Sequence, residues 1–354
     1  MQKRVLLALF LTGSLVAAPL LRAQSALLDL PRASQHAQVM QRVGITNITI
    51  NYHRPLVKGR QMIGKVEPYG KVWRAGANEN TTIAFSDPVT IEGKPLAKGT
   101  YGLHMIPGEN EWTIIFSNNA TSWGSFSYDQ KEDALRVTVK SQPSDFHEAL
   151  TYDFDDVKPN ATLITMRWEK VAVPFHVEVN TNEMVEQSLH NQLRGRAQYE
   201  WQAWDEAANY LLDNKLSADE ALKDADQSIQ LEDRFENLIT KARALDSLGK
   251  KEEATTARNK AVAMGTAIQL HIFGRQLQQQ GKQEEAFAVF RTNIKRYPDH
   301  WLVHNETARL AVAKGDYDTA VKEMKLSLAG ADDPNKPAIE ALLRRLQAKE
   351  DINK

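Results

Sequence analysis

The densest group of chemically useful side chains in the sequence lies between Tyr52 and Arg74. This segment holds six basic residues and one acid, Glu67, so it is far more basic than the rest of the chain. The basic residues are Arg54, Lys58, Arg60, Lys65, Lys71 and Arg74. Guanidinium groups bind carboxylates and phosphates through paired hydrogen bonds. Because Pro and Gly also interrupt the segment, we expect a long loop in which the arginines bind an anion.

The string from Trp73 to Glu79 adds an aromatic ring and further polar groups. Trp73 is able to stack on a sugar ring, while side chains after it supply donors and acceptors. The candidate ligand-binding residues are Arg54, Arg60, Arg74, Asn78 and Glu79. A structural alternative stays open. In it Trp73 lies in the core, Gly76 permits a turn, and the arginines pair with acids at 67, 79 and 153–156.

Catalytic machinery is not recognisable anywhere in the sequence. The chain has no cysteine, which excludes a thiol nucleophile, and no serine stands in a nucleophile-elbow context. His300 and His304 are four residues apart on an expected helix, but the glutamate that directly follows the first histidine of a zinc-protease helix is absent. We therefore predict no catalytic residue, no metal site and no cofactor.

The elements that must position these residues are strands from about residue 24 to residue 180. Polar and apolar residues alternate with period two at 45–50 and 135–140, which is typical of half-buried strands. Further candidate strands lie at 81–86, 89–91, 101–106, 112–116, 149–154, 163–168 and 172–179. Turn residues at 92–95 and 107–110 separate neighbouring candidates. Short strands with no helix between them predict an antiparallel sandwich or barrel-like domain.

After Asn180 the composition changes to that of helices, and a repeat becomes visible. Asn180 is a candidate N-cap with Glu183 three residues later. Similar short strings end in alanines at 221, 254, 286 and 320, a spacing of 33, 32 and 34 residues. A period near 34 is typical of the tetratricopeptide helix-turn-helix unit, which buries its apolar face only by stacking on neighbours. We expect a helical solenoid over residues 181–354.

The N-terminus has the order of a secretory signal peptide. Lys3 and Arg4 precede a short apolar stretch, and Ala23 ends the segment, so residues 1–23 are the expected leader. The formal net charge of the whole chain is −1, and removing a basic leader makes it more negative, which is unfavourable for nucleic-acid binding. We expect an exported protein, periplasmic or extracellular, with no membrane span. A domain of residues 24–180 then precedes the solenoid.

Several strings of the first domain resemble a family known as domain of unknown function 2911. They are the residues at 59–60, 68–79, 89–94, 99–103, 111–116, 123–126 and 135–137. The resemblance runs over about residues 30–154 and implies an exported protein of Gram-negative bacteria, without an established activity. His104 departs from the aromatic or apolar residue expected in the family.

Taken together, these features predict a non-catalytic binding or scaffold protein. The helical repeats are expected to bind a protein or peptide, and the β domain an anionic small molecule, a glycan or an envelope component. The alternative is a periplasmic enzyme, such as a hydrolase, that uses the loop from His53 to Glu79. An enzyme predicts that His53, Arg54, Arg74 and Glu79 converge on one pocket, whereas a scaffold predicts its main groove in the repeats.

Overall fold

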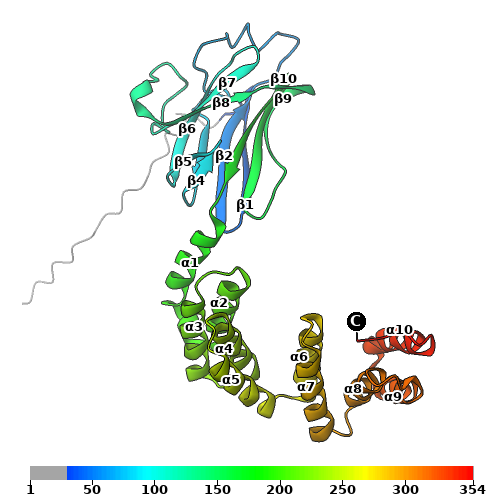
Figure 1. Cartoon of the computed structure of the whole chain (residues 1–354). Coiled ribbons are helices and arrows are strands. Elements are labelled where there is room, and N and C mark those ends of the chain that lie inside the picture. Colours follow the sequence, from blue (N-terminus) through cyan, green and yellow to red (C-terminus); the bar gives the residue numbers. More distant parts are fainter. Residues whose placement is uncertain (1–29, 354) are drawn as a thin grey trace, which may run out of the picture. The chain divides into compact units, whose positions relative to one another are not determined.

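The computed structural model of the chain describes residues 30–353. The chain divides into two compact units, Met1–Met184 and Val185–Lys354, each considered by itself below (Figure 1). The leader expected at residues 1–23 lies outside the described residues.

Ten strands build the described part of the first unit, and they form two antiparallel sheets. The strands are β1 (Gln35–Val43), β2 (Thr46–Arg54), β3 (Thr82–Phe85), β4 (Val89–Ile91), β5 (Lys94–Leu96), β6 (Gly99–Ile106), β7 (Glu111–Ser117), β8 (Asp133–Lys140), β9 (Gln142–Asp155) and β10 (Ala161–Glu178). One sheet has the order β1-β2-β3-β6-β7-β8 and the other β5-β4-β10-β9. A single 3₁₀ turn, Gln130–Glu132, precedes β8.

The polar and apolar residues that alternate in the sequence are, along the strands, alternately more exposed and buried. In β2, Ile48, Ile50 and Tyr52 are buried, and the residues between them are not. Buried residues of both sheets share one core, in which the rings of Trp73 and Trp168 stack with centroids 5.6 Å apart. The first unit is therefore sandwich-like, with Trp73 inside the core as the structural alternative proposed.

Three differences from the expected strands are present. Strand β5 begins inside the turn expected at 92–95, because the left-handed Glu92 and Gly93 alone reverse the chain and Lys94 already pairs with Ile91 of β4. The candidates at 163–168 and 172–179 form one long strand, β10, whose register with β9 shifts on both sides of Glu169. Glu169 has a left-handed φ of 53°, as a β-bulge allows. Strand β1 was not expected, because its polar sequence alternates only weakly. It is defined by pairing along its whole length with β2.

The second unit is helical, apart from short 3₁₀ turns, over its described residues. Its helices are α1 (Thr181–Gln192, which begins just before the division), α2 (Trp201–Asp213), α3 (Ala218–Leu231), α4 (Phe235–Ser247), α5 (Lys251–Met264), α6 (Ala267–Gln279), α7 (Gln283–Arg296), α8 (Trp301–Val312), α9 (Tyr317–Gly330) and α10 (Lys336–Gln347). None of the helices within residues 30–353 has the length and apolar character required to cross a membrane.

The sequence repeat corresponds to four successive helix pairs, from α2–α3 to α8–α9. The four repeat alanines each occupy the fourth position of the second helix of a pair, and each is fully buried. Gly249, Gly281 and Gly315 end three of the first helices with φ between 75° and 77°. The first pair lacks this glycine, and Lys215 takes the left-handed conformation there. The tetratricopeptide-like arrangement therefore follows the period of the sequence.

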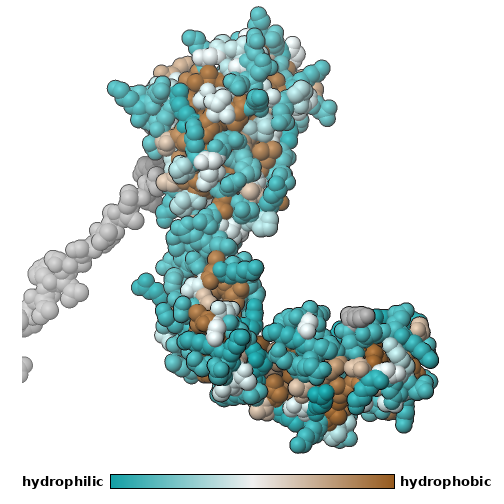
Figure 2. Space-filling model, viewed as in Figure 1, coloured by the Kyte–Doolittle hydropathy of each residue, from teal (hydrophilic) through white to brown (hydrophobic). Residues whose placement is uncertain are grey.

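Most of the visible surface of the helical unit is hydrophilic, with apolar patches between the charged side chains (Figure 2). Several large apolar side chains remain at least two-fifths exposed, among them Met264, Ile268, Ile272 and Leu326.

Candidate functional site

Two of the predicted anion-binding arginines make hydrogen bonds to backbone carbonyls within the β unit. Arg54 donates from Nε to the backbone carbonyl of Leu150 at 2.9 Å. Arg60 donates to the carbonyls of Val57 and Leu56 at 3.0 and 2.6 Å. These bonds hold the long loop after β2 to itself and to β9. Their partners are carbonyls and not the acids that the structural alternative named.

The acids near residue 153 have other partners. Arg167 pairs with Asp153 at 2.9 Å and with Asp155 at 2.6 Å, and Lys158 pairs with Asp156 at 2.8 Å. The structural alternative was therefore right that these acids are paired, but wrong about the residues that pair with them.

Asn78 and Glu79 are also held by neighbours. Asn78 donates to the carbonyl of Ser34 at 3.1 Å, and Glu79 pairs with Arg32 Nη1 at 2.7 Å and with His53 Nε2 at 3.4 Å. Burial acts to raise the pKa of the Glu79 carboxyl, but its own backbone hydrogen bond and the charges of His53 and Arg32 bring that pKa below its usual value. Glu79 is thus a paired carboxylate in the loop that precedes β3.

Arg74 is the candidate whose hydrogen-bonding capacity is not fully used. Its Nε is buried and has no hydrogen-bond partner within residues 30–353. Its guanidinium carbon lies 6.0 Å from the centre of the Trp123 ring, within cation–π range. Trp123 stacks on Phe126, and the two side chains are 59% and 85% exposed. The signal for this pair was present in the sequence as Trp123–Phe126, but nothing in it linked those rings to Arg74.

His104 and Ser125 lie near Arg74, and the distance between their side chains is that of a catalytic base and a serine nucleophile. His104 Nδ1 is 3.0 Å from Ser125 Oγ. The histidine is 2% exposed, and burial lowers its pKa to about 4, with Asp133 and Arg74 as smaller influences. A general base works best with a pKa near the operating pH, so His104 is a weak base. The contact is better suited to holding the loop of Ser125 against β6.

An enzyme was expected to bring His53, Arg54, Arg74 and Glu79 together in one pocket. Only His53 and Glu79 are in direct contact, while Arg54 is bonded to the carbonyl of Leu150. A shallow pocket of about 360 Å³ in the β unit is lined by residues of β2, β3 and β6 with their flanking loops, and it includes none of these four. Within the helical unit, pockets of about 700, 570 and 520 Å³ are present.

One of these helical pockets crosses the first helices of three successive pairs, α2, α4 and α6. We call it the first-helix groove; its volume is about 570 Å³. It is lined by Asp205, Asn209, Phe235, Glu236, Ile239, Thr240, Arg243, Gln269, Ile272, Phe273, Gln276, Gln279 and Gln280. Side-chain amides alternate here with apolar side chains, a combination suited to a peptide backbone and its side chains.

A polar network holds the wall of the first-helix groove. Asn209 donates to Thr240 Oγ1 at 3.0 Å, and Arg243 donates to Asn209 Oδ1 at 2.5 Å and pairs with Asp213. Gln269 donates to Glu236 Oε1 at 2.6 Å. Because helices α2, α4 and α6 are joined through these side chains, the wall of the groove has its shape before any ligand arrives.

The two histidines considered as metal ligands have separate tasks. His300 Nδ1 accepts a hydrogen bond from the Leu302 amide at 3.2 Å, while His304 Nδ1 lies 2.7 Å from Glu323 Oε2. Across the described residues, no group of three or more His, Asp or Glu side chains is arranged to hold a metal ion.

Fold and surface define a two-unit protein: an antiparallel β-sandwich-like domain and a tetratricopeptide-like helical array. Residues 34–177 match the model of the family described as "Protein of unknown function (DUF2911)". This match confirms the resemblance seen in the strings of the first domain. No curated protein matches the chain.

Three solved structures are similar to part of the chain. One is the APC/C hetero-tetramer Cut9–Hcn1, with a TM-score of 0.32, 22% identity and coverage of 46% of this chain and 33% of that one. The second is MamA, with a TM-score of 0.29, 18% identity and coverage of 44% of this chain and 88% of that one. The third is YrrB, titled a TPR protein with an unusual peptide-binding site, with a TM-score of 0.28, 13% identity and coverage of 45% of this chain and 82% of that one. The chain thus spans about a third of the length of the first. These similarities are low, and nothing about partners follows from them.

Proposed function

We propose that this protein is a non-catalytic interaction scaffold whose helical unit binds a protein or peptide in the first-helix groove. The observation that carries the proposal is the groove itself, about 570 Å³ across α2, α4 and α6, with an anchored arginine and side-chain amides beside apolar surface. Amide side chains bond a peptide backbone without regard to its sequence, and apolar surface next to them receives its side chains. Ile272, which is 50% exposed, is such a surface.

The β unit is proposed to bind an anionic ligand at Arg74, alongside the exposed rings of Trp123 and Phe126. The support is the buried Nε of Arg74, which has no partner within the described residues. An arginine with an unpaired Nε–H beside an aromatic surface is suited to a carboxylate on a ring-bearing molecule, even with the carboxyl of Glu67 nearby. Arg54 and Arg60, which bond backbone carbonyls, and Asn78 and Glu79 become supports of this region and not its ligands.

Export to the periplasm or the medium is part of the proposal, and it rests on the sequence order of residues 1–23. N-terminal sequencing of the protein purified from its native cells tests it directly. Cleavage after Ala23 is expected, and an intact Met1 would contradict export through a cleaved leader.

The test of the groove uses peptides selected from a random library on the full chain. The affinity of the tightest peptide is then measured for Arg243→Ala and for the control Arg291→Ala. Arg291 is exposed on α7 and lines none of the helical pockets described above. Loss of at least tenfold in affinity is expected for Arg243→Ala, with a change below twofold for the control. Equal affinity for the two variants, or no selected peptide at all, would remove the groove as the binding surface.

A further inference from the structure

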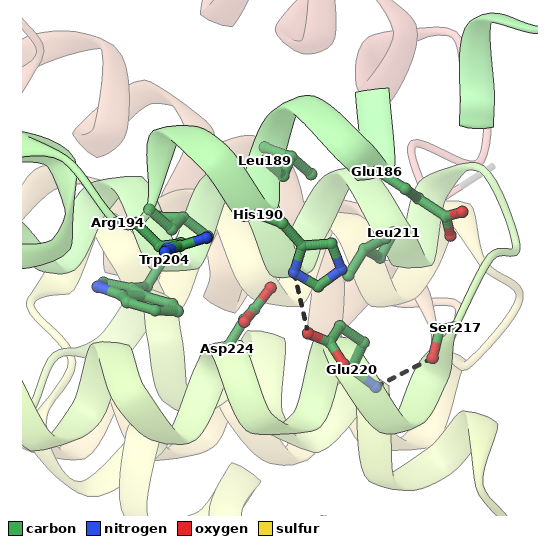
Figure 3. Close-up of a pocket in the computed structure, with 10 residues that line it drawn as sticks. Glu186, Leu189, His190, Arg194, Trp204, Leu211, Ser217, Glu220 and Asp224 are labelled. Atoms are coloured by element: carbon green, nitrogen blue, oxygen red, sulfur yellow. Dashed lines mark hydrogen bonds and ion pairs between the residues drawn. The ribbon is translucent and has the colours of Figure 1, made fainter. Parts of the chain in front are cut away.

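A second pocket of the helical unit, of about 700 Å³, lies between α1, α2 and α3 (Figure 3). We call it the α1 pocket. It is lined by Glu186, Leu189, His190, Leu193, Arg194, Trp204, Leu211, Ser217, Glu220 and Asp224. None of these residues lines the first-helix groove. The volume is in the range that encloses a small organic molecule or a few side chains of a partner.

Four apolar side chains form one part of the lining of the α1 pocket. Leu193 and Leu211 are buried, and Leu189 and Trp204 are partly buried beside them. The indole nitrogen of Trp204 already donates to the carbonyl of Gln198 at 2.9 Å. The tryptophan therefore offers the pocket its ring and not a hydrogen bond, and a ring of this kind attracts organic cations.

The polar groups that face the pocket are mostly acidic. The lining holds three carboxylates, those of Glu186, Glu220 and Asp224, against the guanidinium of Arg194 and the imidazole of His190. Glu220 has weak partners, since His190 Nδ1 lies 3.9 Å and Lys223 Nζ 3.7 Å away. The pocket thus keeps an excess of negative charge.

Asp224 is a buried acid of the α1 pocket that has no hydrogen bond or ion pair within the described residues. Its carboxylate points into the pocket from α3 (Figure 3), and the residue is 6% exposed. Because the residue is buried while its carboxylate faces the pocket, a cation in the pocket would supply the partner that Asp224 lacks. Burial and the nearby Glu220 raise the pKa of Asp224 to about 6, against smaller lowering influences of His190 and Lys223, and this pKa still leaves it ionised at neutral pH.

We infer that the α1 pocket binds an organic cation, an ammonium or guanidinium group on an apolar stem, with Asp224 as its counter-ion. The stem lies against Leu193, Leu211 and the Trp204 ring, while the cation reaches the carboxylates of Asp224 and Glu220. A bare metal ion does not suit the site, because these carboxylates are not among any metal-holding group in the described residues. A lysine or arginine side chain of a partner and a free alkylamine share this chemistry.

The experiment titrates the full chain at pH 7.5 by calorimetry with three probes that share one six-carbon stem: hexylammonium, hexanol and hexanoate. Hexylammonium is expected to bind at least tenfold more tightly than hexanol, and hexanoate not at all. A heptapeptide with one lysine between leucines is compared with the same peptide carrying norleucine. If the lysine peptide binds more tightly than hexylammonium, the cation comes from a protein. If hexylammonium binds more tightly, the ligand is a free amine. Both results support the inference.

Asp224→Asn keeps the shape of the side chain and removes its charge, so hexylammonium affinity should fall at least tenfold. Asp219→Asn is the matched control: it makes the same change on α3, at an exposed residue that does not line the pocket, and less than a twofold effect is expected. Equal binding of hexylammonium and hexanol to the unaltered chain would overturn the inference whether or not the variants fold. Unchanged affinity in a folded Asp224→Asn chain would overturn it as well.

Discussion

The imidazole Nδ1 of His271 lies 3.1 Å from the carboxyl Oε1 of Glu306, whose side chain is fully buried between α6, α7 and α8. The same oxygen accepts a hydrogen bond from Asn293 at 2.7 Å, and Oε2 has no partner within the described residues. Burial raises the pKa of Glu306 to about 8 and lowers that of His271 to about 3. The two groups therefore meet as a neutral pair at pH 7.

Replacing Glu306 by glutamine should remove a pH dependence of stability. Between the unfolded pKa near 4.5 and the folded pKa near 8, the native state holds a proton that the unfolded chain releases, so this group makes the free energy of unfolding fall as pH rises. Below about pH 6.5 the unfolded chain gains a proton on His271, which opposes the trend. From pH 6.5 to 8 we expect a loss of about 2 kcal/mol that Glu306→Gln abolishes.

Urea unfolding at three pH values in this range measures the slope, with the exposed Glu284→Gln as control. A slope in Glu306→Gln as steep as in the unaltered chain would show that Glu306 is ionised in the folded state.

Gly274 leaves room for the Phe290 ring, and filling that room should destabilise the helical unit. A Cβ at position 274 would lie 2.2 Å from Cε1 of Phe290, whose side chain is fully buried. Alanine favours a helix by about 1 kcal/mol over glycine, but overpacking costs about 1–3 kcal/mol, and contact this close belongs at the upper end. We expect Gly274→Ala to lower the free energy of unfolding by about 2 kcal/mol.

The double variant Gly274→Ala, Phe290→Leu tests the cause. Because leucine gives back the space, the two changes together should cost at least about 1 kcal/mol less than their sum in a double-mutant cycle. Additive costs would mean that the ring is not what the glycine accommodates.

The C-terminal segment should be needed to close the helical unit. Ile352 is 1% exposed and packs with α8, α9 and α10, Arg309 donates to its carbonyl, and Asn353 donates to the carbonyl of Arg309 at 3.1 Å. Helix α10 and this segment together cover the apolar face of the α8–α9 pair, which a helical repeat buries only by packing on a neighbour. Ile352→Ala should cost about 2–5 kcal/mol in thermal or urea unfolding, whereas Ile268→Ala, at a residue 55% exposed, should change it by less than about 0.5 kcal/mol.

The two units are expected to unfold independently. Each has its own buried clusters, and the division at Met184 falls four residues from the boundary expected at 180–181. A fragment of residues 181–354 should therefore keep its helical circular dichroism and melt within a few degrees of the helical transition of the full chain. An unfolded fragment would show that the helices depend on the β unit.

The repeat could be predicted well because its signals are local. Ala221, Ala254, Ala286 and Ala320 recur where two helices touch closely, and Gly274 with Phe290 marks one such contact. Strands with strong alternation, such as β2 and β8, were also predicted. β1 was not, because its stability comes from pairing with β2 and not from its own residues.

The candidate site could be predicted only as a set of residues. Arg54 and Arg74 have the same side chain in the same basic loop, yet one bonds a carbonyl 96 positions away in the sequence and the other keeps a buried nitrogen without a partner in the described residues. Composition does not distinguish them, because the partner of a long side chain depends on which distant backbone the fold brings near. Asp224 gave no signal either, since an aspartate in an amphipathic helix usually faces water.

Residue types and spacing by themselves determined the two-part organisation, the helical period and the family resemblance of the first domain, because small, turn-forming and alternating residues act on near neighbours. Tertiary structure alone decided which polar groups are satisfied. Hydrogen bonds and burial are set by distances between segments far apart in the chain, and these distances place Arg54 against a carbonyl, Glu306 against His271 and Asp224 in a pocket without a partner in the described chain.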